Sequence, residues 1–338
     1  MSKDLTTSNV ARQNILNNTA ALNTIRERLG IGGILYDGEF LFTKKMVADF
    51  YEIDERTLER CVEDNLEELK HNGYSLCKGK RLKDIKLQFA HVINVGSKTT
   101  QLVTFNFRSL LNVGMLLSES EKAKQIRSRI LDIVIETINN KAGGNVKYIN
   151  RRDPAYIASA ITESNYRKVF TEAVGQCVAG HRTFKYSQAT DCVYKAVFKE
   201  NAKEYRELLK LDSKDNVHNT LYAEVLLVVA SFENGVGYEI QSMFKKMGRQ
   251  LTMDEVAKIV EDQAENPMMT PFINDARSKM SSRDLALRDI IHVNLEEYLR
   301  AVAPEEYDRF IGSNSIDFDY ILEANKDVLL RLKMDGNE

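Results

Sequence analysis

The chain has 338 residues, a length that predicts about two domains at the usual ~150 residues each. Its composition, 43% apolar and 28% charged, excludes a disordered chain, and no apolar run approaches the ~18 residues that span a bilayer. The net charge of −2 divides unevenly, with 22 Lys and Arg against 18 Asp and Glu through Asn150 and 25 against 31 after it. Four scattered cysteines without a CxxC pair, and a start without a signal-peptide pattern, predict a cytoplasmic protein.

The first predicted elements are a helix and a hairpin. Asn9–Leu29 has apolar side chains along one side at helical spacing, and we expect this helix to pack on its own domain or on a second subunit. In the hairpin, Ile34–Tyr36 and Phe40–Phe42 flank the dipeptide Asp37-Gly38. This dipeptide favours a tight turn between antiparallel strands.

The pattern after the hairpin predicts two short helices joined by a tight turn. Lys44–Tyr51 has apolar residues at helical spacing and follows Thr43, whose hydroxyl suits an N-cap. Asp54 suits the cap of a second helix, Glu55–Asp64, and Ile53 supplies an apolar side chain between the two. These residue types at these spacings are typical of a helix-turn-helix, whose second helix enters a DNA major groove.

The second of these helices would present the side chains that meet DNA. We predict that Arg56 and Arg60 contact base edges, since arginine pairs with guanine, and that Thr57 and Lys44 contact phosphates. The same face carries carboxylates that a phosphate-lined groove repels, namely Glu55, Glu59 and Glu63. A helix-turn-helix retained only for packing, or for docking another protein, therefore remains an open alternative.

A basic segment and a wing are predicted next. We expect a basic loop within Leu66–Lys86, and strands at Phe89–Val95 and Leu102–Phe107 around Gly96-Ser97-Lys98, where a winged helix-turn-helix has its wing. The loop and the wing would contact the flanking DNA backbone through Lys78, Lys80, Arg81, Lys83 and Lys98. Solvated lysines in an ordinary loop are the alternative.

Two helices are predicted within residues 104–140, the second beginning after a cap at Ser118. A strand ending at Phe107, a helix carrying Val113-Gly114, and Lys122–Arg127 opening a long helix resemble the amino-terminal module of phage antirepressors. The pattern is also similar to the BRO-N and RhuM families of phage and mobile-element DNA-binding proteins. The resemblance implies antirepressor or transcriptional-control activity.

The rest of the chain has a predicted linker followed by helical patterns. Glycine and proline pairs place the linker at residues 141–154, and residues 155–338 are expected to form an all-α domain. Val193–Gly235 resembles the carboxy-terminal helical domain attached to many phage regulators. The predicted helices are Tyr156–Gly175, Asp191–Leu211, Thr220–Glu233, Val236–Lys246, Asp254–Ala264, Thr270–Lys279, Ser282–Val302 and Tyr320–Leu332.

No pattern predicts catalysis, a metal or a cofactor. The five histidines lack the i, i+4 spacing of a metal-binding helix, and no nucleotide-binding or nucleophile motif occurs. Asp212–Thr220 precedes an apolar helix, as the phosphate-binding loop of Fic and Doc toxins does, but it lacks their upstream histidine, glycine and arginine. The paired carboxylates Glu224 with Glu233, and Asp284 with Asp289, are expected on solvated helix faces or as caps.

These patterns predict an α+β protein. Residues 1–33 form a leading helix and residues 34–140 a winged helix-turn-helix domain, joined by the linker to an all-α domain. The expected function is a DNA-binding regulator or antirepressor of phage or mobile-element origin. Its partner would be double-stranded DNA, and a homodimer would form through the helical domain and the leading helix. The alternatives are a protein-binding module that sequesters a repressor or joins a phage-defence complex, and a Fic- or Doc-like toxin with a degenerate loop.

Overall fold

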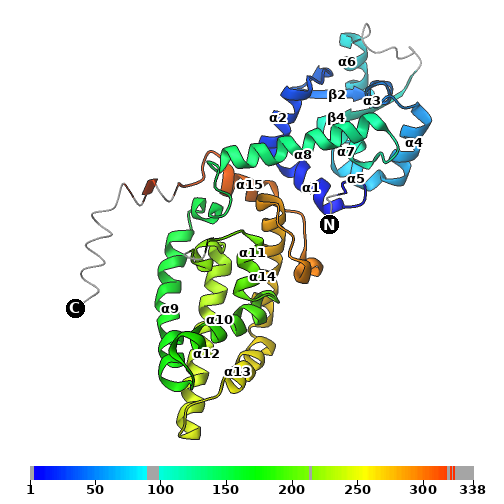
Figure 1. Ribbon diagram of the computed structural model, residues 1–338. Helices are drawn as coiled ribbons and strands as arrows, with labels where there is room; N and C mark the ends of the chain where they lie inside the picture. Colours follow the sequence, from blue (N-terminus) through cyan, green and yellow to red (C-terminus); the bar gives the residue numbers. More distant parts are fainter. Residues whose placement is uncertain (1–3, 90–98, 213–214, 318–319, 322, 324–338) are drawn as a thin grey trace. The chain divides into compact units, whose positions relative to one another are not determined.

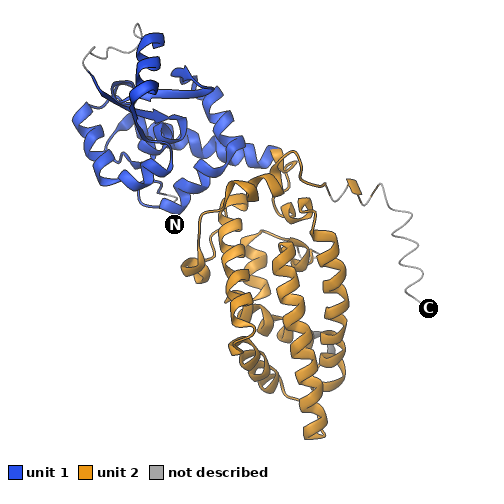
Figure 2. Ribbon diagram, turned by 180° about the vertical axis from the view of Figure 1, so that it is seen from behind, with its two compact units in different colours: residues 1–140 blue, residues 141–338 orange. Residues whose placement is uncertain are grey.

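The structure is a computed structural model that describes residues 4–89, 99–212, 215–317, 320, 321 and 323. It is a mixed α+β protein, mostly helical, that divides into two compact units, Met1–Asn140 and Lys141–Glu338 (Figures 1 and 2). The residues predicted as a linker lie in the second unit, where Ile149 and Asn150 are fully buried. No helix among the described residues combines the length and apolar character needed to cross a membrane.

The first unit is built on a four-stranded antiparallel sheet with the strand order β1-β2-β4-β3. Its strands are β1 (Ile34–Tyr36), β2 (Glu39–Thr43), β3 (Ser75–Lys78) and β4 (Gln101–Asn106). The predicted hairpin is confirmed, because β1 and β2 pair across Asp37 and Gly38. Both turn residues have positive φ angles, 52° and 77°, which the twist of a two-residue hairpin requires.

The described residues of the first unit also form eight helices. They are α1 (Asn9–Asn17), α2 (Thr19–Leu29), α3 (Lys44–Tyr51), α4 (Glu55–Asp64), α5 (Leu66–His71), α6 (Gly79–Phe89), α7 (Phe107–Leu116) and α8 (Glu121–Lys141). On one face of the sheet, Phe42 and Phe105 join the main core with residues of α3, α4 and α7. On the opposite face, Leu41 packs against Leu82 and Ile85 of α6.

The predicted leading helix is two helices, because the chain breaks at Asn18. The side chain of Asn18 accepts a hydrogen bond from the Ala21 backbone and so caps α2. Arg12 of α1, almost fully buried, makes a bidentate ion pair with Glu68 of α5 at 2.7 and 2.8 Å. The apolar sides of α1 and α2 belong to the core of the first unit.

The predicted basic loop is instead folded into regular structure. Lys78 ends β3, and the following basic residues lie on α6, which extends to Phe89. The other residues of the predicted wing strand, as well as Lys98, lie outside the described residues. The cap before α8 is Ser120 rather than Ser118, since its hydroxyl accepts a hydrogen bond from the backbone of Ala123.

The described part of the second unit contains helices and one isolated bridge, between Val178 and Leu251. Gly237 of α12 lies against the backbone of Phe170 in α9, and an added Cβ would come within 3.1 Å of it, so glycine permits this close packing. The α-helices are α9 (Tyr156–Cys177), α10 (Arg182–Phe198), α11 (Ala202–Leu208), α12 (Ala223–Met247), α13 (Met253–Glu265), α14 (Thr270–Arg283) and α15 (Pro304–Ile311). Shorter 3₁₀ and π turns are η1 (Ile149–Arg152), η2 (Val217–Thr220), η3 (Asp284–Arg288) and η4 (Val293–Tyr298).

Several predicted helix ends of the second unit were wrong. α12 continues through Gly235, where a break was predicted, because tertiary packing outweighs the ~1 kcal/mol helix cost of a glycine. The predicted Asp191–Leu211 helix is divided at Lys199, which takes a left-handed conformation with φ 56°. Irregular turns replace most of the predicted Ser282–Val302 helix, and α15 was missed. Most of the predicted Tyr320–Leu332 helix lies outside the described residues.

Candidate nucleic-acid interface

The two helices α3 and α4 begin and end as the sequence predicts. The hydroxyl of Thr43 accepts a hydrogen bond from the Met46 backbone, and the carboxylate of Asp54 accepts one from the Thr57 backbone at 2.8 Å. Between them, Glu52 has a left-handed backbone with φ 54°, and the Ile53 amide bonds to the Ala48 carbonyl. The corner between the helices is therefore fixed by both caps and by the backbone.

Helix α4 has one buried side and one exposed side. Leu58 and Val62 are buried in the core, which directs the intervening polar residues outward. Arg56 and Arg60 are exposed, and their side chains make no hydrogen bond or ion pair with the residues that the structure describes. Thr57, a predicted phosphate contact, donates its hydroxyl proton to Asp54 at 2.8 Å and is likewise exposed.

Lys44 lies where two carboxylates of α4 meet. Its Nζ is 2.8 Å from Glu55 Oε2 and 2.7 Å from Glu59 Oε1. These hydrogen bonds, the one to Glu55 foremost, raise the pKa of Lys44 above its ordinary value. The sequence pattern predicts Lys44 as a phosphate contact. It does not predict this bridge, because the bridge joins two helices across a turn.

The other predicted backbone contacts are divided between the two faces of the sheet. Lys80, Arg81 and Lys83 are exposed on α6, which covers the face opposite to α4. Arg81 lies over the ring of Tyr36, 5.8 Å from its centroid. Lys78 is also exposed, but side chains alternate along a strand, so it projects from the face that packs α4.

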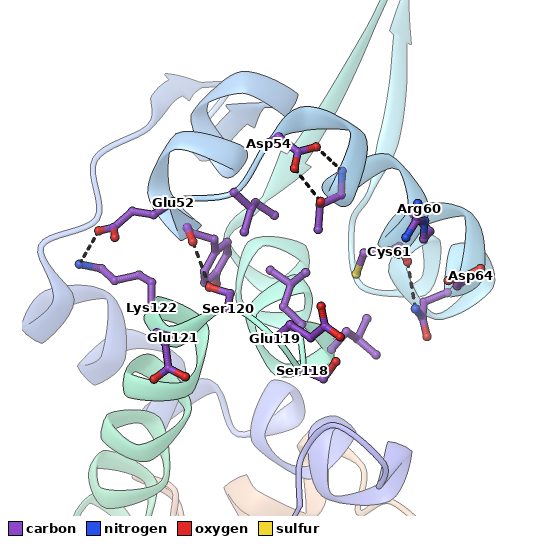
Figure 3. Close-up of a pocket in the computed structure, with 16 residues that line it drawn as sticks. Glu52, Asp54, Arg60, Cys61, Asp64, Ser118, Glu119, Ser120, Glu121 and Lys122 are labelled. Atoms are coloured by element: carbon purple, nitrogen blue, oxygen red, sulfur yellow. Dashed lines mark hydrogen bonds and ion pairs between the residues drawn. The ribbon is translucent and has the colours of Figure 1, made fainter.

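A groove lies beside α4, between the corner of the two helices and residues 116–122 (Figure 3). It encloses about 620 Å³, and Arg60 and Lys122 are its two cationic side chains. Lys122 pairs with Glu52 at 3.3 Å, and Ser120 donates a hydrogen bond to the Tyr51 carbonyl. Among its charged lining residues, carboxylates outnumber the two cations: they are Glu52, Asp54, Asp64, Glu119 and Glu121.

The second unit has titratable side chains that the sequence placed wrongly. Glu233, expected on a solvated face, is fully buried, and burial raises its pKa. Its Oε1 is 3.0 Å from Arg167, which also contacts His218, and His218 Nδ1 lies 3.0 Å from Glu163. Within the described part of the chain, no group of three or more His, Cys, Asp or Glu side chains is arranged to hold a metal ion.

Comparisons with family models, curated proteins and solved structures give no match to the chain.

Proposed function

We propose that the protein is a DNA-binding regulator that inserts α4 into a major groove. The observation that best supports this proposal is the pair Arg56 and Arg60. Both side chains are exposed on one face of α4, and neither makes a hydrogen bond or ion pair with the described residues. Four residues of helix advance ~6 Å, so the two guanidinium groups would reach bases about two steps apart. Each can make a bidentate contact with the edge of a guanine.

The order of elements in the first unit supports a winged helix-turn-helix. Helices α3 and α4 lie between β2 and β3 in the chain, while β4 lies between these two strands in the sheet. In this proposal, the wing would belong to the connection from β3 to β4, which begins with the basic helix α6. Lys78, which projects from the face of the sheet that packs α4, would contact the flanking DNA backbone, whereas the cations of α6 lie on the opposite face.

Replacing both arginines with alanine should remove sequence-selective binding. We expect each of Arg56→Ala and Arg60→Ala to weaken binding to a selected duplex about 5- to 150-fold, the effect of ~1–3 kcal/mol per lost bidentate contact. Weak, salt-sensitive binding to other DNA should remain. The measurement is equilibrium binding to random and selected fragments at ~50 and ~200 mM salt, where several phosphate contacts give a steep loss of affinity.

The matched control is Arg129→Ala, which removes an exposed arginine from α8. It should leave the discrimination between fragments unchanged. The absence of DNA binding by the parent protein at ~50 mM salt would contradict the proposal. Equal discrimination by the parent and the double variant would exclude base reading by α4.

The regulator is proposed to act as a homodimer, since a two-fold protein matches a palindromic site. Because α1 and α2 use their apolar sides internally, the second unit is the proposed source of the subunit interface. Light scattering of the purified full chain tests the dimer directly. A monomer at micromolar concentration would contradict it.

A protein-binding role is the second candidate, and the acidic groove beside α4 favours it. Five carboxylates against two cations would suit a basic partner better than a phosphate backbone. The resemblance to phage antirepressors accommodates this role as well, through sequestration of a repressor. Binding to a basic protein that is lost with Glu119→Gln/Glu121→Gln, in a chain that binds no DNA, would favour this candidate over the first.

A further inference from the structure

Lys44 joins the two helices of the proposed DNA-reading unit through charge. It is the first residue of α3, Glu55 is the first residue of α4, and Glu59 lies one turn later on the same helix. The single ammonium group is within 2.8 Å of a carboxylate oxygen of each. One cation thus forms ion pairs with two anions, which without it would lie unpaired on the exposed face of α4.

The charges of that face make the bridge relevant to binding a polyanion. Without Lys44, the exposed residues of α4 would present four carboxylates, including those of Glu63 and Asp64, against the two arginines. Unpaired carboxylates near a phosphate-lined groove are repulsive, and like charges at contact distance repel each other even in water. A lysine that instead turned to a phosphate would leave Glu55 and Glu59 uncompensated.

We propose that Lys44 is a positioning residue that pairs with Glu55 and Glu59 and offsets one of their two negative charges, so that α4 meets DNA with its arginines available and these two carboxylates occupied. This inference rests on the proposed DNA-binding function. The proposed role of Lys44 differs from a phosphate contact, because Lys44 stays paired with Glu55 and Glu59 when DNA is bound. It also assigns base selection to arginine on guanine rather than to these glutamates on cytosine.

The test compares how much Lys44→Met weakens DNA binding in two backgrounds, the parent chain and the Glu55→Gln/Glu59→Gln variant. If Lys44 offsets the charge of the two carboxylates, Lys44→Met should weaken DNA binding about tenfold in the parent, because both carboxylates then repel nearby phosphates. In the Gln background, which lacks these carboxylates, Lys44→Met should weaken binding less than about twofold. Lys44→Arg should bind like the parent, because it can hold both ion pairs. Binding is measured on one selected duplex over ~50–200 mM salt.

A phosphate contact gives a different result. In that case Lys44→Met would weaken DNA binding by the same factor in both backgrounds. The slope of log affinity against log salt concentration would become shallower by about 0.9 in each. That outcome overturns the proposal. The matched control is Lys45→Met, the exposed neighbour on α3, whose cost should be equal in the two backgrounds. A parent chain that binds no DNA overturns the proposed function instead, so the two failures are distinguishable.

Discussion

Arg288→Met should destabilise the second unit by about 3–5 kcal/mol, because it removes the guanidinium that pairs with a fully buried carboxylate. Arg288 and Asp284 have no exposed side-chain surface and are 2.9 Å apart. The guanidinium also donates to the carbonyls of Val146, Lys147 and Thr220 at 2.8–3.0 Å. The substitution therefore removes a charge and leaves three carbonyl groups without this donor.

Unfolding of each unit is followed separately through buried cysteines. Cys177 reports on the second unit and Cys77 on the first, by brief alkylation across a urea titration and mass spectrometry. The Cys177 midpoint should fall steeply in the variant, while the Cys77 midpoint should stay. Arg300→Met, which removes an exposed arginine, should change neither by more than ~0.5 kcal/mol. A similarly small change in Arg288→Met would contradict the importance of the buried pair.

The local elements of the first unit could be predicted because their signals are local. The caps at Thr43 and Asp54 and the Asp37-Gly38 turn satisfy backbone groups within three residues of themselves. No distant contact is needed to decide such features. The same is true of the exposed face of α4, since the buried positions Leu58 and Val62 already set its orientation.

Helix α6 was missed although the sequence carries its signal. Leu82, Ile85 and Phe89 repeat at helical spacing, and all three pack in the small core under the sheet. The lysines and arginine between them suggested a solvated loop. What the sequence could not show is that β3 presents a second apolar face, around Cys77, for this helix to cover.

The charged networks of the second unit could not be predicted because their partners are distant in the chain. Asp284 looked like a solvated helical carboxylate, yet it accepts a hydrogen bond from Tyr222, 62 residues away, and lies 2.9 Å from His292. Asp284 is buried by packing between segments distant in the chain, which no local sequence pattern predicts. Burial alone would raise the pKa of Asp284, but the charge of Arg288 and its other partners lower it.

His292 is the group whose titration should make the second unit sensitive to alkaline pH. Its Nε2 is 2.9 Å from Asp284 and its Nδ1 is 2.9 Å from Glu200, and the ring is almost fully buried. Burial by itself would lower the pKa of His292, but hydrogen bonds and charge from these two carboxylates raise it to about 9. The imidazolium is therefore the favoured form at neutral pH in the folded protein.

The raised pKa of His292 decides whether the second unit gains or loses stability as pH rises. A histidine whose pKa is higher in the folded than in the unfolded state stabilises the fold fully below its unfolded pKa of ~6.5, and this contribution is lost as pH rises through about 9. A difference of this size corresponds to about 3 kcal/mol. We expect the Cys177 urea midpoint to fall between pH 6 and pH 9, and to fall much less in His292→Gln.

The exposed His71 supplies the control, since His71→Gln should keep the full pH dependence of the parent. The imidazole signal of His292, followed by NMR in the folded chain, gives the same answer without an unfolding measurement. A titration midpoint near 6.5 would contradict the charged network. A midpoint near 9, together with a flat profile in His292→Gln, would establish that the buried carboxylates Asp284 and Glu200 hold a protonated histidine as part of the fold.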